Sequence, residues 1–256
     1  MEKLAERLAA IPGVVAVTLG GSRARGEERP DSDWDFGLYY EGKLRAEDVR
    51  ALGFPGEVVE PGEWGRLVNG GAWLEVDGVR VDLLYRDLRF VEKWVDEASA
   101  GRFEVDRVGG FVAGMATYVL VGELAVGKTL VGELPRPEFP DALREAAPPR
   151  WRRDADFSLA VAEQAAQRGD VASCAGLIIR AAIAEAQARL AATGEWALNE
   201  KGILRRAGLG ALEPTLALVG LRPSELTRSV ARVRAELNRA ATTRTGDETN
   251  GKAGLK

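Results

Sequence analysis

Three aspartates in the first third of the chain have the residue type and spacing that metal-dependent chemistry requires. Asp33 and Asp35 lie at the start of residues 33–40, which are predicted to form a β-strand. Side chains two positions apart in a strand project from the same face. Asp82 lies inside the apolar run 79–85, where a carboxylate is costly unless it is paired or bound to a metal. Because hard divalent cations prefer oxygen ligands, Asp33, Asp35 and Asp82 are candidate catalytic residues and candidate ligands of Mg²⁺ or Mn²⁺.

A glycine-rich turn comes before these aspartates. The β-branched and apolar run 14–19 predicts a buried strand that leads directly into Gly20, Gly21 and Ser22. Paired glycines let the backbone approach a ligand closely, and the following helix start offers free N–H groups to phosphate. Three carboxylates beside a phosphate site suit two-metal catalysis, in which one ion activates a hydroxyl and the other neutralises a leaving pyrophosphate.

Each of these features also has an ordinary structural explanation. Gly-Gly-Ser is a common turn, and residues 31–33 could form a solvated Asx turn. Asp82 could be the buried ion-pair partner of Arg80 or Arg86. The combination of all three features, in this order and beside predicted strands, favours the catalytic interpretation.

The composition restricts the chemistry further. The 256 residues include no histidine and one cysteine, Cys174, which excludes Ser-His-Asp or Cys-His catalysis, His-ligated metals and an internal disulfide. This cysteine usage fits a reducing cytoplasm, where we expect the protein. Residues 1–7 predict an amphipathic helix rather than a signal peptide. No apolar run approaches the roughly 20 residues of a membrane span.

The charge is uneven along the chain. Residues 1–150 contain 19 Lys and Arg against 27 Asp and Glu, whereas residues 151–256 contain 16 against 12. The two parts therefore have net charges of −8 and +4. An acidic N-terminal part argues against a nucleic-acid partner and suits metal ions or a cationic small molecule.

The apolar patterns predict the elements that position these side chains. Asp77-Gly78 between two apolar runs is typical of a type I′ hairpin over residues 73–85. The acidic, Gly- and Pro-rich residues 53–71 predict a loop at the edge of the site. The other elements expected in this part are strands at 14–19 and 33–40 and helices at 1–10, 44–52, 87–100 and 113–126.

A proline-rich joint at residues 135–149 leads into an Ala- and Arg-rich part that reads as helical. The expected helices cover residues 154–168, 170–193, 199–207 and 224–241. We therefore predict a catalytic domain at 1–134, a helical bundle on the acceptor side at 135–241 and a disordered tail at 242–256.

The order of the motifs resembles the polymerase-beta-like nucleotidyltransferase superfamily, whose pattern is Gly-Ser, Asp-x-Asp on a strand and a third acid on a later strand. The motifs read Gly-Gly-Ser-Arg-Ala-Arg-Gly from residue 20, Asp-Ser-Asp-Trp-Asp-Phe from residue 31 and Val-Asp-Leu-Leu from residue 81. The helical part resembles the bundle of small bacterial members, notably aminoglycoside nucleotidyltransferases and the antitoxins of nucleotidyltransferase–HEPN pairs. The implied fold class is α+β, a mixed β-sheet flanked by helices and followed by a C-terminal α-helical bundle.

The resemblance implies transfer of a nucleoside monophosphate, AMP in the first instance, from an NTP to a hydroxyl of a small-molecule acceptor, with release of pyrophosphate. By motif, Gly21 and Ser22 would hold the β- and γ-phosphates. Asp33 and Asp35 would bridge two Mg²⁺ ions, with Mn²⁺ as a substitute, and Asp82 would complete the site of the catalytic ion. No residue matches a separate general base, so Asp82 is also the candidate for that role.

Three further residues are candidate nucleotide-binding residues. Arg23 and Arg25 follow the glycine turn and could reach phosphate, or could instead pair with Glu27 or Glu28. Lys201 lies between two expected helices, where it would face the nucleotide or the acceptor from the helical part.

Three functions stay open from the sequence. The leading one is an enzyme for an aminoglycoside-like cation, which the acidic residues Glu57, Glu60 and Glu63 would attract. An antitoxin-type enzyme would instead modify a protein partner, a HEPN toxin, and association as a homodimer also stays open. A regulatory module would bind nucleotide without turnover.

Residues 122–129 formally match the P-loop expression Gly-x₄-Gly-Lys-Thr. A P-loop requires a long helix directly after the threonine, whereas residues 130–135 would break such a helix at once. We therefore interpret the match as chance and expect Gly127 to end a helix.

Overall fold

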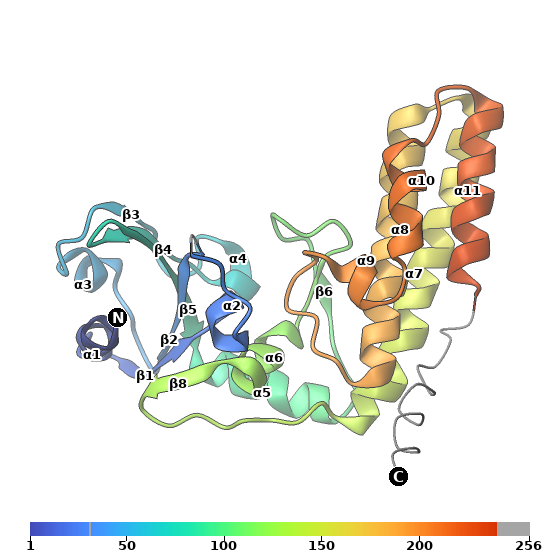
Figure 1. Ribbon diagram of the computed structural model, residues 1–256. Coiled ribbons are helices and arrows are strands. Elements are labelled where there is room, and N and C mark those ends of the chain that lie inside the picture. Colours follow the sequence, from blue (N-terminus) through green and yellow to red (C-terminus); the bar gives the residue numbers. More distant parts are fainter. Residues whose placement is uncertain (31, 240–256) are drawn as a thin grey trace, which may run out of the picture.

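The computed structural model describes residues 1–30 and 32–239, so the tail predicted at 242–256 lies outside the described residues. Figure 1 shows a twisted sheet with short helices around it and, beside it, a bundle of long helices that stand side by side. This is the α+β architecture that the sequence predicted. The domain boundary at residue 135 stays a prediction.

The N-terminal part alternates short helices with strands. Its elements are α1 (Glu2–Ala9), β1 (Val14–Leu19), α2 (Gly21–Arg25), β2 (Trp34–Tyr40), α3 (Ala46–Arg50), β3 (Gly56–Val58), α4 (Gly65–Val68), β4 (Gly71–Val76), β5 (Val79–Asp87), α5 (Leu88–Ser99), β6 (Val105–Asp106), β7 (Met115–Ala116), α6 (Val119–Val126) and β8 (Lys128–Val131). The helices α1 and α5 and the strands β1 and β2 lie where the sequence placed them.

Six strands form one mixed sheet in the order β3-β4-β5-β2-β1-β8. The pair β2–β5 is parallel, and the other four neighbouring pairs are antiparallel. A parallel pair requires a crossover connection. Residues 41–78 make this crossover and contribute α3, β3, α4 and β4 on the way. The crossover brings the start of β2 beside the first half of β5, where the candidate aspartates lie.

The β4–β5 hairpin confirms the turn that was predicted from Asp-Gly. Asp77 and Gly78 have φ angles of +53° and +76°, both in the left-handed region that a type I′ turn requires. The tight turn fixes the register of the two strands, so that Trp73 lies opposite Asp82.

The two faces of the sheet bury different cores. Phe36 and Leu38 of β2 point to one face, where they pack with Leu8 of α1. Asp35 and Tyr39 point to the opposite face, and Tyr39 packs there into the core that includes α5 and α6. We call this second face, which bears Asp35, the acid face.

The C-terminal part is helical, and α7, α8 and α11 form its bundle (Figure 1). Its elements are α7 (Asp141–Arg168), α8 (Val171–Thr193), α9 (Ile203–Arg206), the 3₁₀ turn η1 (Gly210–Leu212), α10 (Glu213–Ala217) and α11 (Pro223–Leu237). The corner between α7 and α8 confirms the expected break. Gly169 is left-handed, and the Asp170 carboxylate accepts a hydrogen bond from the Ser173 N–H.

The proline-rich joint differs from the prediction. Helix α7 begins at Asp141, thirteen residues before the expected start at residue 154, and runs through Pro148 and Pro149. Proline has a φ angle that a helix accepts, although it removes a backbone donor. Pro148 and the fully buried Trp151 pack into the core. We infer that this packing outweighs the two lost helical hydrogen bonds.

Other segments are shorter or more regular than expected. Residues 53–71, expected as a loop, contain β3 and α4. The helix expected at 113–126 begins only at Val119, because residues 115–116 pair with 105–106. The helix expected at 199–207 is reduced to α9, and α11 ends at Leu237.

Helix α8 is long and apolar enough to cross a membrane by length and composition, with a mean hydropathy of 1.3 over an 18-residue window. In this fold, 56% of that window is buried. Cys174 and Ile178 are fully buried, and α8 packs along most of its length against α7. The apolar character of α8 therefore supplies the core of the bundle.

Candidate active site

Asp35 and Asp82 lie next to each other on the acid face. The parallel pairing of β2 with β5 puts their Cα atoms directly opposite each other. Asp33 lies two residues earlier, just before the start of β2. Paired positions, and positions two apart on a strand, share one face of a sheet. The topology thus brings the three predicted carboxylates to one region.

The charges of these aspartates act on one another. Burial raises the pKa of Asp35, and the Asp33 carboxylate raises it further. Burial also raises the pKa of Asp82, with further contributions from Asp35 and then Asp33. The Lys201 ammonium lowers both of these pKa values and so opposes the trend. A bound divalent cation would relieve the same repulsion.

Asp33 has a cationic neighbour in this structure. Its Oδ1 lies 2.8 Å from Nε of Arg80, whose side chain is 73% exposed. The pair lacks hydrogen-bond geometry, and Oδ1 has no hydrogen-bond donor among the described residues. Arg80 therefore pairs with Asp33 and, as shown below, Arg86 pairs with Glu123. The alternative in which either arginine pairs with Asp82 is wrong.

The glycine turn lies directly against Asp35. The Gly20 N–H donates to the Asp35 carbonyl oxygen at 2.8 Å. Gly21 has a φ angle of +61°, and a Cβ placed on it would lie 1.7 Å from Oδ2 of Asp35. A side chain at this position would therefore displace the carboxylate, which explains why the turn needs glycine there. Helix α2, which contains Ser22, follows at once.

Arg23 holds the segment that precedes β2. Its guanidinium donates to the carbonyl oxygens of Ser32 and Asp33, at 2.7 and 3.1 Å. The same guanidinium lies over the ring of Trp34, 4.3 Å from its centroid. In this structure Arg23 thus positions Asp33 and Trp34, and its predicted contact with phosphate stays a prediction.

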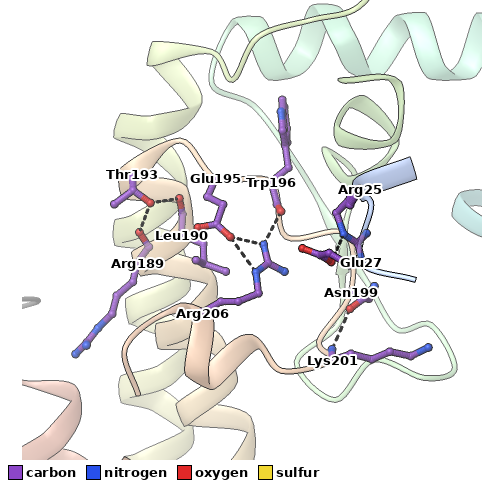
Figure 2. A network of polar contacts seen from close by, with 10 residues as sticks. All are labelled: Arg25, Glu27, Arg189, Leu190, Thr193, Glu195, Trp196, Asn199, Lys201 and Arg206. Carbon is purple, nitrogen blue, oxygen red and sulfur yellow. Dashed lines mark hydrogen bonds and ion pairs between the residues drawn. The ribbon is translucent and has the colours of Figure 1, made fainter. Parts of the chain in front are cut away.

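Arg25 makes the alternative contact that the sequence offered for it, an ion pair of 2.7 Å with Glu27. Its side chain is 34% exposed and lowers the pKa of Asp35. Figure 2 shows Arg25 and Glu27 facing the loop between α8 and α9, near Asn199 and Lys201. A cavity between them is lined by residues of both parts of the chain, including Arg25, Trp196, Lys201 and Arg206.

Lys201 comes to this region from the helical part. Its backbone N–H donates to Oδ1 of Asn199 at 3.0 Å, which forms a local turn (Figure 2). Lys201 makes no ion pair within residues 1–30 and 32–239, although its charge acts on Asp35 and Asp82. The role of Lys201 in nucleotide binding stays a prediction.

Glu200, the neighbour of Lys201, has a structural role. Its carboxylate accepts hydrogen bonds from the N–H groups of Val112 and Ala113, at 2.6 and 2.8 Å. These contacts attach the loop that carries Lys201 to the segment between β6 and β7. A separation of 87 or 88 residues along the chain hides this contact from sequence reasoning.

A pocket next to Asp35 contains residues that the sequence analysis missed. It lies between the glycine turn, the acid face and α6, and its lining includes Gly21, Asp35, Glu123, Leu198 and Asn199. Glu123 belongs to the segment that formally matches a P-loop. That segment consists of the last residues of helix α6, which ends at Gly127 as expected, and the first residues of β8; the Gly127 N–H donates to the Glu123 carbonyl oxygen.

Arg86, which is buried, and Glu123, which is partly exposed, form an ion pair in the lining of this pocket. Nε and Nη2 of Arg86 donate to the two carboxylate oxygens of Glu123, at 2.6 and 2.8 Å. Nη1 donates to the carbonyl oxygens of Val68 and Tyr85. The Arg86 side chain is 3% exposed. The pair therefore joins β5 to α6 and fixes one wall of the pocket.

We expect Arg86→Met to lower the free energy of unfolding by about 3–5 kcal/mol, because it leaves the Glu123 carboxylate without its buried partner. Urea denaturation measures this change. The control is Arg102→Met, which removes the exposed ion pair of Arg102 with Glu97 and should cost no more than about 1 kcal/mol. Equal losses in the two variants would contradict the assignment.

The donor set on the acid face suits Mg²⁺ or Mn²⁺. All three candidate ligands offer carboxylate oxygens, they repel one another, and Oδ1 of Asp33 lacks a hydrogen-bond donor among the described residues. In residues 1–30 and 32–239, no three acidic, cysteine or histidine side chains already have the spacing to hold one ion. In this structure the three aspartate carboxylates are therefore not arranged to hold one ion together.

Comparison with known families identifies the N-terminal part. Residues 1–100 match the family model of the nucleotidyltransferase domain. The matched segment contains the glycine turn, the three aspartates and the β4–β5 hairpin. Residues 1–100 are therefore similar to the nucleotidyltransferase domain family, and this match supports a nucleotidyltransferase enzyme.

No curated protein matches the chain. A similar solved structure is that of a nucleotidyltransferase-like protein from Exiguobacterium sibiricum 255-15, with 12% sequence identity. The similarity covers 92% of this chain and 72% of that chain, with a TM-score of 0.45.

Proposed function

We propose that this enzyme moves AMP from ATP to a hydroxyl of a small cationic acceptor, such as an aminoglycoside, and releases pyrophosphate in a reaction that depends on Mg²⁺. The observation that carries this proposal is the register of β2 with β5, which puts Asp35 opposite Asp82 next to the glycine turn. The family match at residues 1–100 supports the general reaction.

Asp33, Asp35 and Asp82 would hold two Mg²⁺ ions. When bound, the ions would lower the pKa of the attacking hydroxyl and neutralise charge on the leaving pyrophosphate. The protein contributes an acidic face that repels further anions unless these cations are present. We therefore expect nucleotide binding to require the divalent ion.

The phosphates of the nucleotide would lie at the glycine turn. Gly21 has no side chain to block the approach, and Ser22 follows at the start of α2. Arg25 and Lys201 face the same region from the two parts of the chain, and both lower the pKa of Asp35. Binding to a phosphate would require Arg25 to leave Glu27, an exposed contact whose rupture costs little free energy.

The acceptor hydroxyl would attack from the side of Asp82. Asp82 is the candidate acceptor of the hydroxyl proton, because no other residue matches a general base by motif. Acidic residues around the face would attract an acceptor that carries ammonium groups. Among the acids suggested for this role, Glu60 pairs with Arg50 and Glu63 accepts a hydrogen bond from the Glu60 N–H, so Glu57 is the better candidate.

The direct test measures pyrophosphate release from ATP, and from the other three NTPs, with a panel of aminoglycosides and lincosamides. We expect release with Mg²⁺ or Mn²⁺ and at least one cationic acceptor, and none with EDTA. Failure of release with every small molecule, together with transfer of labelled AMP to a co-expressed protein, would contradict the small-molecule proposal. Tight ATP binding without any transfer would contradict catalysis altogether.

Asp82→Asn should lower kcat by about 100-fold and change the KM for ATP by less than about threefold, because Asp82 serves the attacking hydroxyl rather than the triphosphate. Steady-state pyrophosphate release measures both constants. Asp77→Asn, in the turn of the same hairpin, is the control and should leave both unchanged. A variant of Asp82 with normal kcat and a raised KM would assign the residue to nucleotide binding instead.

A further inference from the structure

An exposed tryptophan lies beside the candidate active site. Trp73 of β4 is 49% exposed, although a large aromatic side chain normally favours burial. The register of the sheet pairs Trp73 with Asp82 on one side and with Glu57 of β3 on the other. Because Asp82 pairs in turn with Asp35, four strands present these residues in one row on the acid face.

A second tryptophan packs against the first. The rings of Trp64 and Trp73 have centroids 4.5 Å apart and an angle of 35° between their planes. Gly71 allows this arrangement, since a Cβ there would lie 2.8 Å from Cζ3 of Trp64 and 1.9 Å from the Leu83 carbonyl oxygen. The sheet backbone itself thus makes room for Trp64, and the two rings form one aromatic surface.

The order of Asp35, Asp82, Trp73 and Glu57 along the row matches the order in which the leaving pyrophosphate and the attacking hydroxyl would lie. The glycine turn lies next to Asp35 at one end, and Trp73 and Glu57 lie beyond Asp82 at the other. In a phosphoryl-type transfer, the attacking and leaving oxygens lie on opposite sides of the phosphorus. A leaving pyrophosphate at the glycine turn therefore places the attacking hydroxyl on the side of Trp73.

We propose that Trp73, supported by Trp64, is the surface on which the acceptor ring stacks, and that Glu57 binds an ammonium group of that ring. This inference rests on the proposed function. The acceptor oxygen forms a bond to the α-phosphorus while the bond from this phosphorus to the bridging oxygen of pyrophosphate breaks. The electron pair leaves with pyrophosphate, and the hydroxyl proton passes to the Asp82 carboxylate.

The acceptor class follows from the chemistry of the row. A ring with an apolar face stacks on an indole, and a cation gains from both the ring quadrupole and a nearby carboxylate. An aminated sugar or cyclitol has both properties. A neutral nucleobase could stack on the indole of Trp73 but would gain nothing from the charge of Glu57. The structure therefore favours the acceptor, rather than the nucleobase, as the group that stacks on Trp73.

The test compares Trp73→Ala and Trp73→Phe with the wild type, with kanamycin as the acceptor. We expect Trp73→Ala to raise the KM for kanamycin by about 10–100-fold and to change the KM for ATP by less than about twofold. Trp73→Phe should restore most of the affinity. The control is Phe157→Ala, which removes an exposed aromatic side chain from α7 in the helical part and should change neither constant.

Glu57→Gln tests whether the negative charge of the Glu57 carboxylate binds an ammonium group of the acceptor. It should weaken binding of kanamycin by about tenfold and leave binding of kanamycin with all its amines acetylated unchanged. A rise in the KM for ATP upon Trp73→Ala would overturn the proposal and assign the indole to the nucleobase. Equal affinity of wild type and Trp73→Ala for kanamycin would also overturn it.

Binding without nucleotide separates this inference from the proposed function. Calorimetry of kanamycin with the wild type and with Trp73→Ala, in the absence of ATP, reports the aromatic surface even if no pyrophosphate is ever released. Loss of binding in Trp73→Ala would support the surface, whereas absence of binding to the wild type would count against it. Absence of turnover with intact binding would contradict only the proposed reaction.

Discussion

Asp35→Asn is expected to lower the rate of nucleotidyl transfer by at least about 10³-fold, equivalent to about 4 kcal/mol of transition-state stabilisation. Asp35 lies opposite Asp82 and two residues from Asp33, and it would be one of the ligands of the metal ions. An amide has no charge to neutralise those ions. Pyrophosphate release at saturating Mg²⁺ and ATP measures the loss, and Asp77→Asn is the matched control.

The same substitution should make the metal-free protein more stable at neutral pH. Burial and Asp33 raise the pKa of Asp35 in the folded state above its ordinary value of 3.8. The folded state therefore binds the proton more tightly, and its stability is lost as the pH rises through the raised pKa. The amide of the variant does not ionise. The difference in Tm between variant and wild type should therefore develop as the pH rises through the raised pKa of Asp35.

Thermal unfolding in EDTA, from pH 4 to pH 7, checks this expectation. The difference in Tm between Asp35→Asn and the wild type should grow with pH and should disappear on addition of Mg²⁺, which stabilises only the wild type. A variant that is less stable than the wild type at pH 7 would show that Asp35 holds the fold together, and the loss of activity would then have a structural cause.

Gly21→Ala is expected to lower the transfer rate by about 100-fold or more. The new Cβ would lie 1.7 Å from Oδ2 of Asp35, so the carboxylate must move away from its observed position. Displacement of a catalytic group by about 1 Å is enough for a loss of this size. Pyrophosphate release measures the rate, and urea denaturation measures the accompanying loss of stability.

Gly26→Ala provides a close control for this substitution. Gly26 ends the same helix, α2, with a φ angle of +70°, but a Cβ there would meet no atom within 4 Å. Both alanine variants therefore bear the cost of a left-handed backbone, about 1–2 kcal/mol, and only Gly21→Ala disturbs Asp35. Equal losses of activity in the two variants would contradict the contact between the glycine turn and the carboxylate.

Much of the sheet could be predicted because residues close together in the sequence determine its turns and the faces of its strands. Asp77-Gly78 fixes a type I′ turn, and the alternation in 79–85 fixes which face Asp82 joins. The pairing of Asp35 with Asp82 then follows once β2 and β5 are neighbours. The sequence analysis did not specify that β2 and β5 are neighbours, because no local pattern specifies a parallel pair.

The unpredicted contacts are those that join distant segments. Arg86 with Glu123 and Glu200 with the Val112 and Ala113 amides depend on how α6 and the α8–α9 loop pack, which charges and spacing along the chain do not reveal. The start of α7 was missed for a related reason. Proline lowers helix propensity locally, whereas the burial of Trp151 that stabilises the turn is a tertiary effect.

The crossover at residues 41–78 separates two tasks in this protein. The register of β2 with β5 sets the catalytic carboxylates, and both strands lie outside the crossover. Glu57, Trp64 and Trp73 all belong to the chain between them. Exchange of that intervening segment for another of different length or composition could thus retarget the enzyme to new molecules while its reaction stays the same.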